Sequence, residues 1–204
     1  VHPWLIEDCE DDWFDLLKQY LNNQPSGVGE IGLDKIKDEN WDQQVDFFLK
    51  QFQLAIQLNR PVCIHCVHAW QKLLEILKDI RPPEGIFMIH SFAGSAQIAE
   101  QIQQKGGYLS FSAWALVEKK LQKTAEVLKA VNPERILIET DSPFGIGLNK
   151  YHPFLEKNSD GRNRNVPANL PAIAVGLAEL MGMDKGEFAE LTTKNAMRFL
   201  QQII

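Results

Sequence analysis

The sequence predicts an α/β fold in which helices cover a parallel sheet, and three observations lead to this expectation. Short apolar runs alternate with longer segments of helical periodicity along the chain. The runs are too short for helices and are bounded by glycine or proline, as buried parallel strands are. The 204 residues, of which 45% are hydrophobic and 24% charged, suit one globular domain with a full-sized core. We therefore expect a single domain over residues 1–204.

Five apolar runs are the expected strands. They cover residues 27–31, 62–65, 86–90, 108–111 and 136–141. Strands that alternate with helices are joined by right-handed crossovers and lie parallel. A doubly wound open sheet and a (β/α) barrel both satisfy this pattern, so periodicity alone leaves the two architectures open.

Helical segments lie between these runs and after the last of them. Asp11 or Asp12 is expected to cap the first helix, which runs through Leu21. Its apolar face is expected to contain Trp13, Leu16, Leu17 and Tyr20. Further helices are expected over residues 41–58, 70–80, 95–105, 117–131, 167–181 and 184–201, with an irregular stretch over 143–166.

Charge and composition narrow the functional classes. The formal charge is −6, from 21 basic and 27 acidic residues, whereas proteins that bind nucleic acid through their surface usually have a basic excess. A polyanionic substrate would therefore need a bound metal ion or a local pocket. We see neither a membrane span nor a secretory signal, and three cysteines form no disulfide framework. We expect a cytoplasmic protein, with the nucleus as the alternative.

Four of the apolar runs have a residue that can bind metal at or next to their carboxyl end: Glu30, His65, His90 and Asp141. The carboxyl ends of parallel strands meet at one edge, so these side chains are expected to converge there. A single histidine at a strand end is usually packed or hydrogen-bonded, but four such residues together predict a site for a divalent cation. Glu139 has the opposite parity to Thr140 and is expected to be a wall residue, with an ion pair as one option, whereas Asp141 is the functional residue.

Other polar residues admit two interpretations each. Cys63 and Cys66 form a Cys-x-x-Cys pattern, but Cys63 falls in a strand, which favours structural cysteines over a redox pair. His68 could contact substrate or be an ordinary histidine. Ser95 opens a helix whose amides suit a phosphate, although a simple helix cap explains it equally well. Arg164 is a candidate phosphate contact in a polar, basic cluster.

Five motifs together resemble one enzyme family. They are Gly29-Glu30-Ile31-Gly32-Leu33-Asp34, Pro61-Val62-Cys63-Ile64-His65-Cys66, His90-Ser91-Phe92-Ala93-Gly94-Ser95, Glu139-Thr140-Asp141-Ser142-Pro143 and Arg164-Asn165-Val166-Pro167. In this order they resemble the TatD-type metal-dependent deoxyribonucleases, which are metallo-dependent hydrolases. The resemblance covers nearly the whole chain and implies a TIM-barrel-type (β/α) fold.

The resemblance also implies a function. It implies that Glu30, His65, His90 and Asp141 hold one or two divalent ions (Mg, Mn or Zn), with Glu30 and Asp141 as the catalytic carboxylates. The implied reaction is the hydrolysis of DNA phosphodiester bonds from a 3′ end. His68, Ser95 and Arg164 are the expected substrate contacts. We expect a monomer that acts on DNA and has no membrane partner.

The chain departs from the family pattern at two places. No arginine follows His65, where Val67-His68-Ala69 stand, and no His-x-His pair occurs among the five histidines. Val1-His2-Pro3-Trp4 resembles the end of the family's third strand, which implies that the first two strands are absent and that activity is weakened. Association through the open barrel edge then becomes an alternative to the monomer. A non-catalytic relative that binds metal or nucleic-acid ends, and a hydrolase of another small substrate, are the alternative functions.

Overall fold

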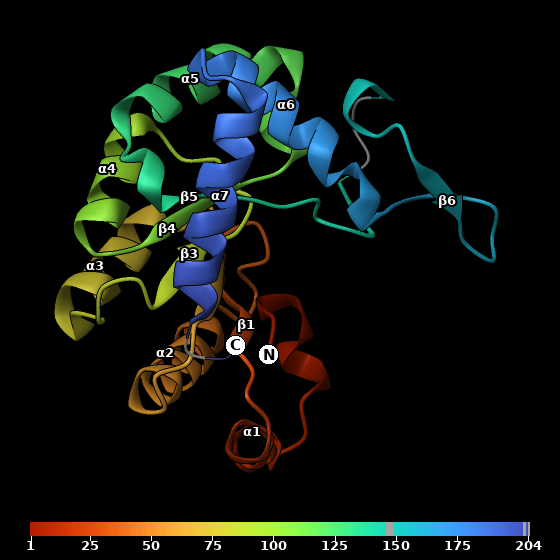
Figure 1. Cartoon of the computed structure of the whole chain (residues 1–204). Coiled ribbons are helices and arrows are strands. Elements are labelled where there is room, and N and C mark those ends of the chain that lie inside the picture. The colour runs from red at the N-terminus through yellow and green to blue at the C-terminus, as the bar shows by residue number, and fades with distance from the viewer. Residues whose placement is uncertain (146–148, 202, 204) are drawn as a thin grey trace. The chain divides into compact units, whose positions relative to one another are not determined.

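The computed structural model describes residues 1–145, 149–201 and 203. Five strands follow one another in chain order, β1-β2-β3-β4-β5, in a parallel sheet. Helices connect the successive strands (Figure 1). The expected α/β class with a parallel sheet is therefore confirmed.

The chain divides into two units, which are described separately. Unit 1 comprises Val1–His90, Gln104–Tyr108 and Met197–Ile204, and unit 2 comprises Ser91–Gln103 and Leu109–Ala196. The expectation of a single domain over residues 1–204 stays a prediction.

Unit 1 contains strands β1 (Val28–Asp34), β2 (Val62–Val67) and β3 (Phe87–Ile89). The first two extend further than their apolar runs indicated, because ladder pairing continues through Asp34 opposite Val67. The register shifts between Val28 and Ile31, so β1 contains an extra residue there. Glu30 therefore lies within a bulged strand and His65 within β2, rather than at the strand ends where we expected them.

The helices of unit 1 are α1 (Trp13–Asn23), α2 (Trp41–Gln57) and α3 (Trp70–Ile80), close to the expected ranges. The expected apolar face of α1 is wrong in part, since Leu16 is 44% and Tyr20 68% exposed. The side of α1 that packs against the unit contains Trp13, Leu17 and Leu21, which are spaced four residues apart. The Trp13 ring stacks on Phe47 at 4.1 Å, and Leu21 is buried.

Two buried glutamines connect α2 to the rest of unit 1. The Gln44 side chain accepts a hydrogen bond from the Asp34 amide at 2.8 Å and donates to the Lys37 carbonyl. Gln51 accepts from the amino group of Val1 and donates to its carbonyl at 3.1 Å. Both side chains are fully buried, so they hold the end of β1 and the start of the chain against α2.

The first residues do not form the strand end that we expected from Val1-His2-Pro3-Trp4. Pro3 begins a 3-10 helix, η1 (Pro3–Asp8), and the His2 side chain accepts from the Trp4 amide at its start. Proline has no N–H for a strand ladder, and its fixed φ suits the first turn of a helix.

Unit 2 contains most of α4 (Ala96–Gln104), together with α5 (Leu121–Ala130) and α6 (Leu170–Met181). Strand β4 (Tyr108–Phe111), which begins in unit 1, pairs with β5 (Ile136–Ile138) through Leu109–Phe111. Helix α7 (Lys185–Leu200) ends in unit 1. The helix predicted over 117–131 is split, because a 3-10 turn at Glu118–Lys120 precedes α5.

The stretch predicted to be irregular contains a short hairpin of β6 (Leu155–Lys157) and β7 (Asn163–Asn165). Within unit 2 this hairpin projects away from α5 (Figure 1). Residues 146–148 of the same stretch lie outside the described residues.

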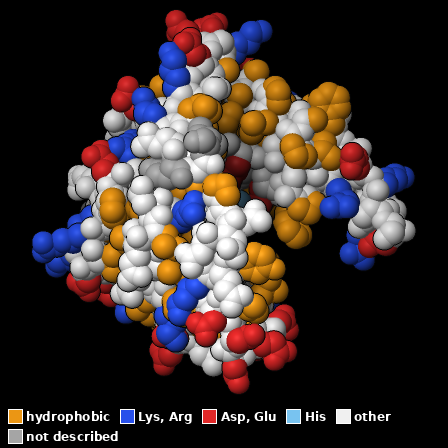
Figure 2. Space-filling view, turned by 60° about the horizontal axis from the view of Figure 1, so that its bottom comes forward, with side chains coloured by type: hydrophobic (Ala, Val, Ile, Leu, Met, Phe, Trp, Pro, Cys, Tyr) orange, Lys and Arg blue, Asp and Glu red, His pale blue; other side chains and the backbone are white. Residues whose placement is uncertain are grey.

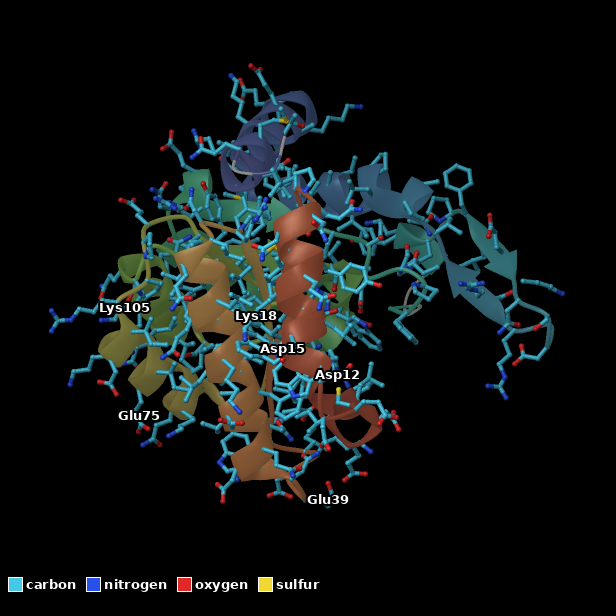
Figure 3. The ribbon with its side chains drawn as sticks, turned by 90° about the horizontal axis from the view of Figure 1, so that it is seen from below. Asp12, Asp15, Lys18, Glu39, Glu75 and Lys105 are labelled. Carbon is cyan, nitrogen blue, oxygen red and sulfur yellow. The ribbon has the colours of Figure 1, made fainter. Side chains whose placement is uncertain are left out.

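Most charged side chains lie at the surface, and Asp34 is a buried exception. In unit 1, α1 carries an ion pair between Lys18 and Asp15 at 2.9 Å, and both are labelled in Figure 3. Acidic side chains gather along one edge of the face drawn in Figure 2, as the net charge of −6 leads one to expect. None of the described helices is long and apolar enough to cross a membrane.

Candidate metal centre

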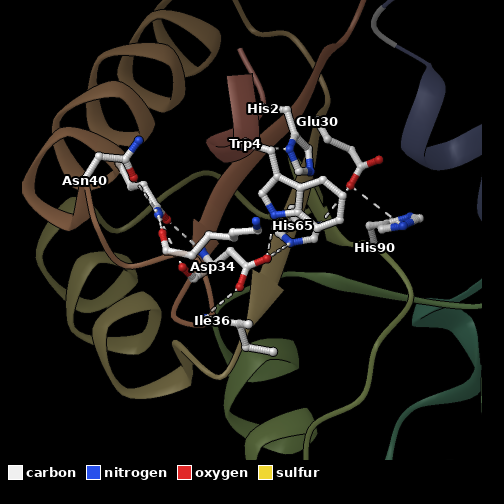
Figure 4. Close-up of polar contacts among 10 residues, drawn as sticks. His2, Trp4, Glu30, Asp34, Ile36, Asn40, His65 and His90 are labelled. Atoms are coloured by element: carbon white, nitrogen blue, oxygen red, sulfur yellow. Dashed lines mark hydrogen bonds and ion pairs between the residues drawn. The ribbon is translucent and has the colours of Figure 1, made fainter. Parts of the chain in front are cut away.

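Glu30 occupies the bulged part of β1, where two glycines let the strand approach β2 closely. A Cβ on Gly29 would lie 2.6 Å from the Cβ of Cys63, and one on Gly32 would lie 1.9 Å from the carbonyl oxygen of His65. A bulge redirects the side chain that it carries and is common next to active sites. Here it directs the carboxylate of Glu30 toward the histidines of unit 1 (Figure 4).

His65 lies between two carboxylates. Its Nε2 is 3.3 Å from Oδ2 of Asp34, and its Nδ1 is 3.4 Å from Oε2 of Glu30. Asp34 is almost completely buried, and its Oδ2 also accepts a hydrogen bond from Trp4 Nε1 at 2.7 Å. An ionised carboxylate only accepts, so Nε2 of His65 donates to Asp34 and, in the neutral ring, Nδ1 presents a lone pair to Glu30.

Two further histidines approach the same carboxylate. Nε2 of His90, which directly follows β3, is 3.7 Å from Oε2 of Glu30. The His90 amide donates to the Ile64 carbonyl at 2.9 Å and so keeps the residue beside His65. The His2 ring packs edge-on against the His65 ring at 4.6 Å, and His2, Glu30 and His65 each offer a ligand atom within 4.8 Å of the others.

The pKa shifts follow from this crowding. Burial and, after it, the charge of the neighbouring His65 lower the pKa of His2 to about 4, so the ring is neutral at pH 7. Burial would raise the pKa of Glu30, but the contact with the His65 side chain and the positive charge that His90, His65 and His2 carry when protonated outweigh it and lower the pKa. Burial would likewise raise the pKa of Asp34, and hydrogen bonds from Trp4, Ile36 and His65 lower it overall.

The donor set fits a divalent cation. Among the described residues, Oε2 of Glu30 is buried and accepts no hydrogen bond, although imidazole nitrogens lie 3.4 and 3.7 Å away. A buried anionic oxygen without a hydrogen bond needs a positive charge close to it, which a bound cation would supply. Carboxylate and imidazole are ligands that Zn and Mn accept.

Asp141 belongs to unit 2 and lies three residues beyond the end of β5. Its backbone has a left-handed φ of 62°. The buried side chain of Asn165 donates to the Thr140 carbonyl at 2.7 Å, and the Asn165 amide donates to the Pro143 carbonyl at 3.1 Å. These contacts hold the loop on both sides of Asp141. The convergence of Asp141 with Glu30, His65 and His90 stays a prediction.

The other expected residues have diverse surroundings. Glu139 accepts hydrogen bonds from the Ser91 amide at 2.7 Å and from Ser110 Oγ at 2.6 Å, as a wall residue would. Ser95 is exposed, and its Oγ accepts from the Ile98 amide at 3.3 Å, so it acts as a helix cap. His68 is exposed after β2, and Arg164 is exposed on β7. All three cysteines are free.

Residues 1–201 match the family model described as TatD related DNase. This chain belongs to the TatD-related DNase family. It is 33% identical over 197 residues to the metal-dependent hydrolase YabD of Bacillus subtilis, covering 96% of this chain and 73% of that protein. It is 30% identical over 200 residues to a protein of Erwinia tasmaniensis named 3′-5′ ssDNA/RNA exonuclease TatD, covering 97% and 75%.

Solved structures of TatD proteins share the fold. The crystal structure of YjjV, a TatD homologue from Escherichia coli, superposes with a TM-score of 0.84 at 27% identity and covers 98% of this chain and 74% of its own. A TatD-family hydrolase from Entamoeba histolytica has a TM-score of 0.72 at 22% identity, covering 93% and 67%, and supports the fold alone. The family resemblance and the TIM-barrel-type (β/α) fold are therefore confirmed.

Three residues of this centre were not among our expected site residues: His2, Trp4 and Asp34. His2 and Trp4 were assigned to a strand end, and Asp34 was noted only as the end of the Gly29–Asp34 motif. The signal for Asp34 was present, since a buried strand that ends in a carboxylate needs partners for it. No pattern in the sequence indicated that the first residues fold back onto β2.

Proposed function

We propose that this TatD-family chain is a metal-dependent nuclease that hydrolyses phosphodiester bonds of DNA, beginning at a 3′ end. The observation that carries the proposal is the buried Oε2 of Glu30, which lies among imidazole nitrogens without a hydrogen bond in the described part of the chain. Membership of the family and the exonuclease name of the Erwinia tasmaniensis relative support it.

The ligands that we propose are Glu30, His65 and His90, with His2 beside them and Asp141 from unit 2. They would hold one or two divalent ions, for which Mg, Mn and Zn are the candidates. When bound, such an ion supplies Lewis acidity toward a phosphoryl oxygen and toward water.

The chain's own residues supply the remaining steps. Glu30 and Asp141 are the proposed catalytic carboxylates, which accept the proton of the attacking water. The lowered pKa of Glu30 keeps this carboxylate ionised and able to accept. Asp34 fixes the ring of His65 through its hydrogen bond to Nε2. His68, Ser95 and Arg164 remain proposed substrate contacts, and the monomer remains the proposed state.

A nuclease assay on single-stranded DNA tests the proposal. The purified chain is incubated with strands labelled at either end, in Mg, Mn or Zn and with a chelator. We expect loss from the 3′ end that stops with chelator and is nearly abolished by Glu30→Gln or Asp141→Asn. Glu39→Gln, which changes an exposed carboxylate on the loop before α2, is the matched control and should be fully active.

One feature of the sequence favours a second candidate. The histidines of this sequence stand at positions 2, 65, 68, 90 and 152, and none of them forms a His-x-His pair. A chain that binds metal and DNA ends but leaves both labelled strands intact under every condition would contradict the nuclease and support a non-catalytic relative. Cleavage that survives the chelator would contradict both.

A further inference from the structure

Unit 2 contains a cavity that none of the proposed metal ligands lines. Its volume is about 160 Å³, and its walls include Phe92 and Gly94, the indole of Trp114, and the side chains of Lys120 and Lys123. The loop Ser91–Gly94 directly follows His90 in the chain, and Ala113 begins the 3-10 helix after β4. The cavity therefore lies beyond the carboxyl end of β4, the edge at which α/β sheets bind ligands.

Trp114 is held in place although its ring is 41% exposed. Its amide donates to Ser112 Oγ at 3.3 Å, and Ser112 Oγ is 2.8 Å from Ser91 Oγ. Ser112 is 1% exposed, so a buried hydroxyl holds the backbone of Trp114. A large aromatic ring that is fixed at its backbone and open on one face offers a surface for stacking at little entropic cost.

The charge of the cavity differs from that of the chain. Among the described residues, two lysines and no carboxylate line it, whereas the chain has a net charge of −6. Lys123 Nζ donates to the Ala93 carbonyl at 2.7 Å and holds the opposite wall, while Lys120 Nζ lies 5.5 Å from the centre of the Trp114 ring. Burial and the charges of Lys119 and Lys123 lower the pKa of Lys120, as expected for ammonium groups that lie close to one another.

We propose that this cavity binds one nucleotide of a single-stranded nucleic acid, with the base stacked on Trp114 and a phosphate beside Lys120. The inference rests on the proposed nuclease function, whose substrate it would help to hold. A base presents a flat ring to the indole whatever its sequence, and a lysine suits a phosphate as a point charge. The cavity supplies locally the positive charge that the surface lacks.

Binding without turnover tests this assignment. The probe is a 5′-phosphorylated thymidine dinucleotide in chelator, titrated calorimetrically against the chain. We expect Trp114→Ala to weaken binding about tenfold and Trp114→Phe to weaken it less, because an aromatic face remains. Lys120→Ala should weaken binding and reduce the slope of log affinity against log salt by about one.

The matched control is Lys129→Ala, which removes an exposed lysine of α5 that does not line the cavity. It should bind the dinucleotide like the wild type. Thermal unfolding of each variant shows whether it is folded. If Trp114→Ala does not fold, Trp114→Phe still tests the role of the indole. Inorganic phosphate is the second probe, and it should bind more weakly than the dinucleotide.

The outcomes separate the two proposals. Binding that depends on Trp114 and Lys120, in a chain without nuclease activity, supports the nucleotide site and contradicts the proposed function. Variants that bind and cleave like the wild type overturn the nucleotide site and leave the function intact. Inorganic phosphate that binds as tightly as the dinucleotide, with no effect of Trp114→Ala, also overturns it.

Discussion

Asp34 is a buried carboxylate that orients His65, one of the proposed metal ligands. Its Oδ2 lies 3.3 Å from Nε2 of His65 and accepts from Trp4 at 2.7 Å, while its Oδ1 accepts from the Ile36 amide at 2.9 Å. These contacts fix the ring orientation of His65 before any ion binds. Carboxylate partners of this kind orient a metal-binding histidine and make it a stronger ligand.

Asp34→Asn should therefore weaken metal binding by about 10–100-fold, as loss of such partners does elsewhere. Competition with a chromophoric chelator measures this directly, without reference to activity. Asp38→Asn is the matched control, because the Asp38 carboxylate is exposed and lies 3.7 Å from Lys35. An affinity of Asp34→Asn equal to that of the wild type would contradict the role of Asp34.

Cys66 should be unreactive in the native protein. It is 7% exposed, and burial raises its pKa to about 12. Alkylation requires the thiolate, which is then scarce at pH 8, whereas an unfolded cysteine ionises near pH 8.5. Mass spectrometry after iodoacetamide treatment should find Cys66 labelled in urea but not in buffer. Equal labelling rates in the two conditions would contradict this protection.

Helix α2 positions the centre through its polar residues. Gln44, which is fully buried, bonds both the amide and the carbonyl of Asp34, at 2.8 and 3.3 Å. Gln44→Ala leaves these groups unpaired and should lower the free energy of unfolding by about 1–3 kcal/mol. Urea denaturation measures the loss. Gln43→Ala changes the exposed neighbour on the same helix and should have little effect, so equal losses would contradict the argument.

The bounds of helices and strands could be predicted where they depend on hydrophobic periodicity. Strand β4 has the bounds of its apolar run, and α3 begins at Trp70 and ends at Ile80 as expected. The bulge at Glu30 was not predictable, because register depends on the partner strand. The hairpin of β6 and β7 was missed because its residues are mostly exposed and show no apolar alternation.

Only part of the candidate site could be predicted from the sequence. Glu30, His65 and His90 come together in unit 1, as their positions after apolar runs indicated. A sequence pattern assigns polar residues to the solvent-exposed face. Gln51 is polar but buried, and its burial depends on tertiary contacts that the pattern does not contain. The position of His2 could not be predicted for the same reason, because its neighbour Val1 is held against α2 by a tertiary hydrogen bond from Gln51.

The proposed centre joins segments that are distant in the chain, so metal binding should stabilise the whole of unit 1. His2 comes from the first residues, Glu30 from β1, His65 from β2, and His90 from the end of β3. A ligand that binds only the folded state, present at 100 times its Kd, adds about 2.7 kcal/mol to the free energy of unfolding. Thermal unfolding should therefore shift upward with Zn or Mn and return with chelator. Glu30→Gln should remove most of the shift, while Glu39→Gln should keep it.

Hydrogen exchange locates the same effect within the chain. Metal should slow exchange in β1, β2 and the first residues, because opening these segments now requires release of the ion. If Asp141 is a ligand, exchange in the loop from Thr140 to Pro143 should slow as well, and Asp141→Asn should cancel that part alone. Protection confined to unit 1 would contradict the assignment of Asp141 while leaving Glu30, His65 and His90 as ligands. An upward shift in unfolding temperature that persists in Glu30→Gln would mean that the stabilising ion binds elsewhere, and the centre built around this carboxylate would be wrong.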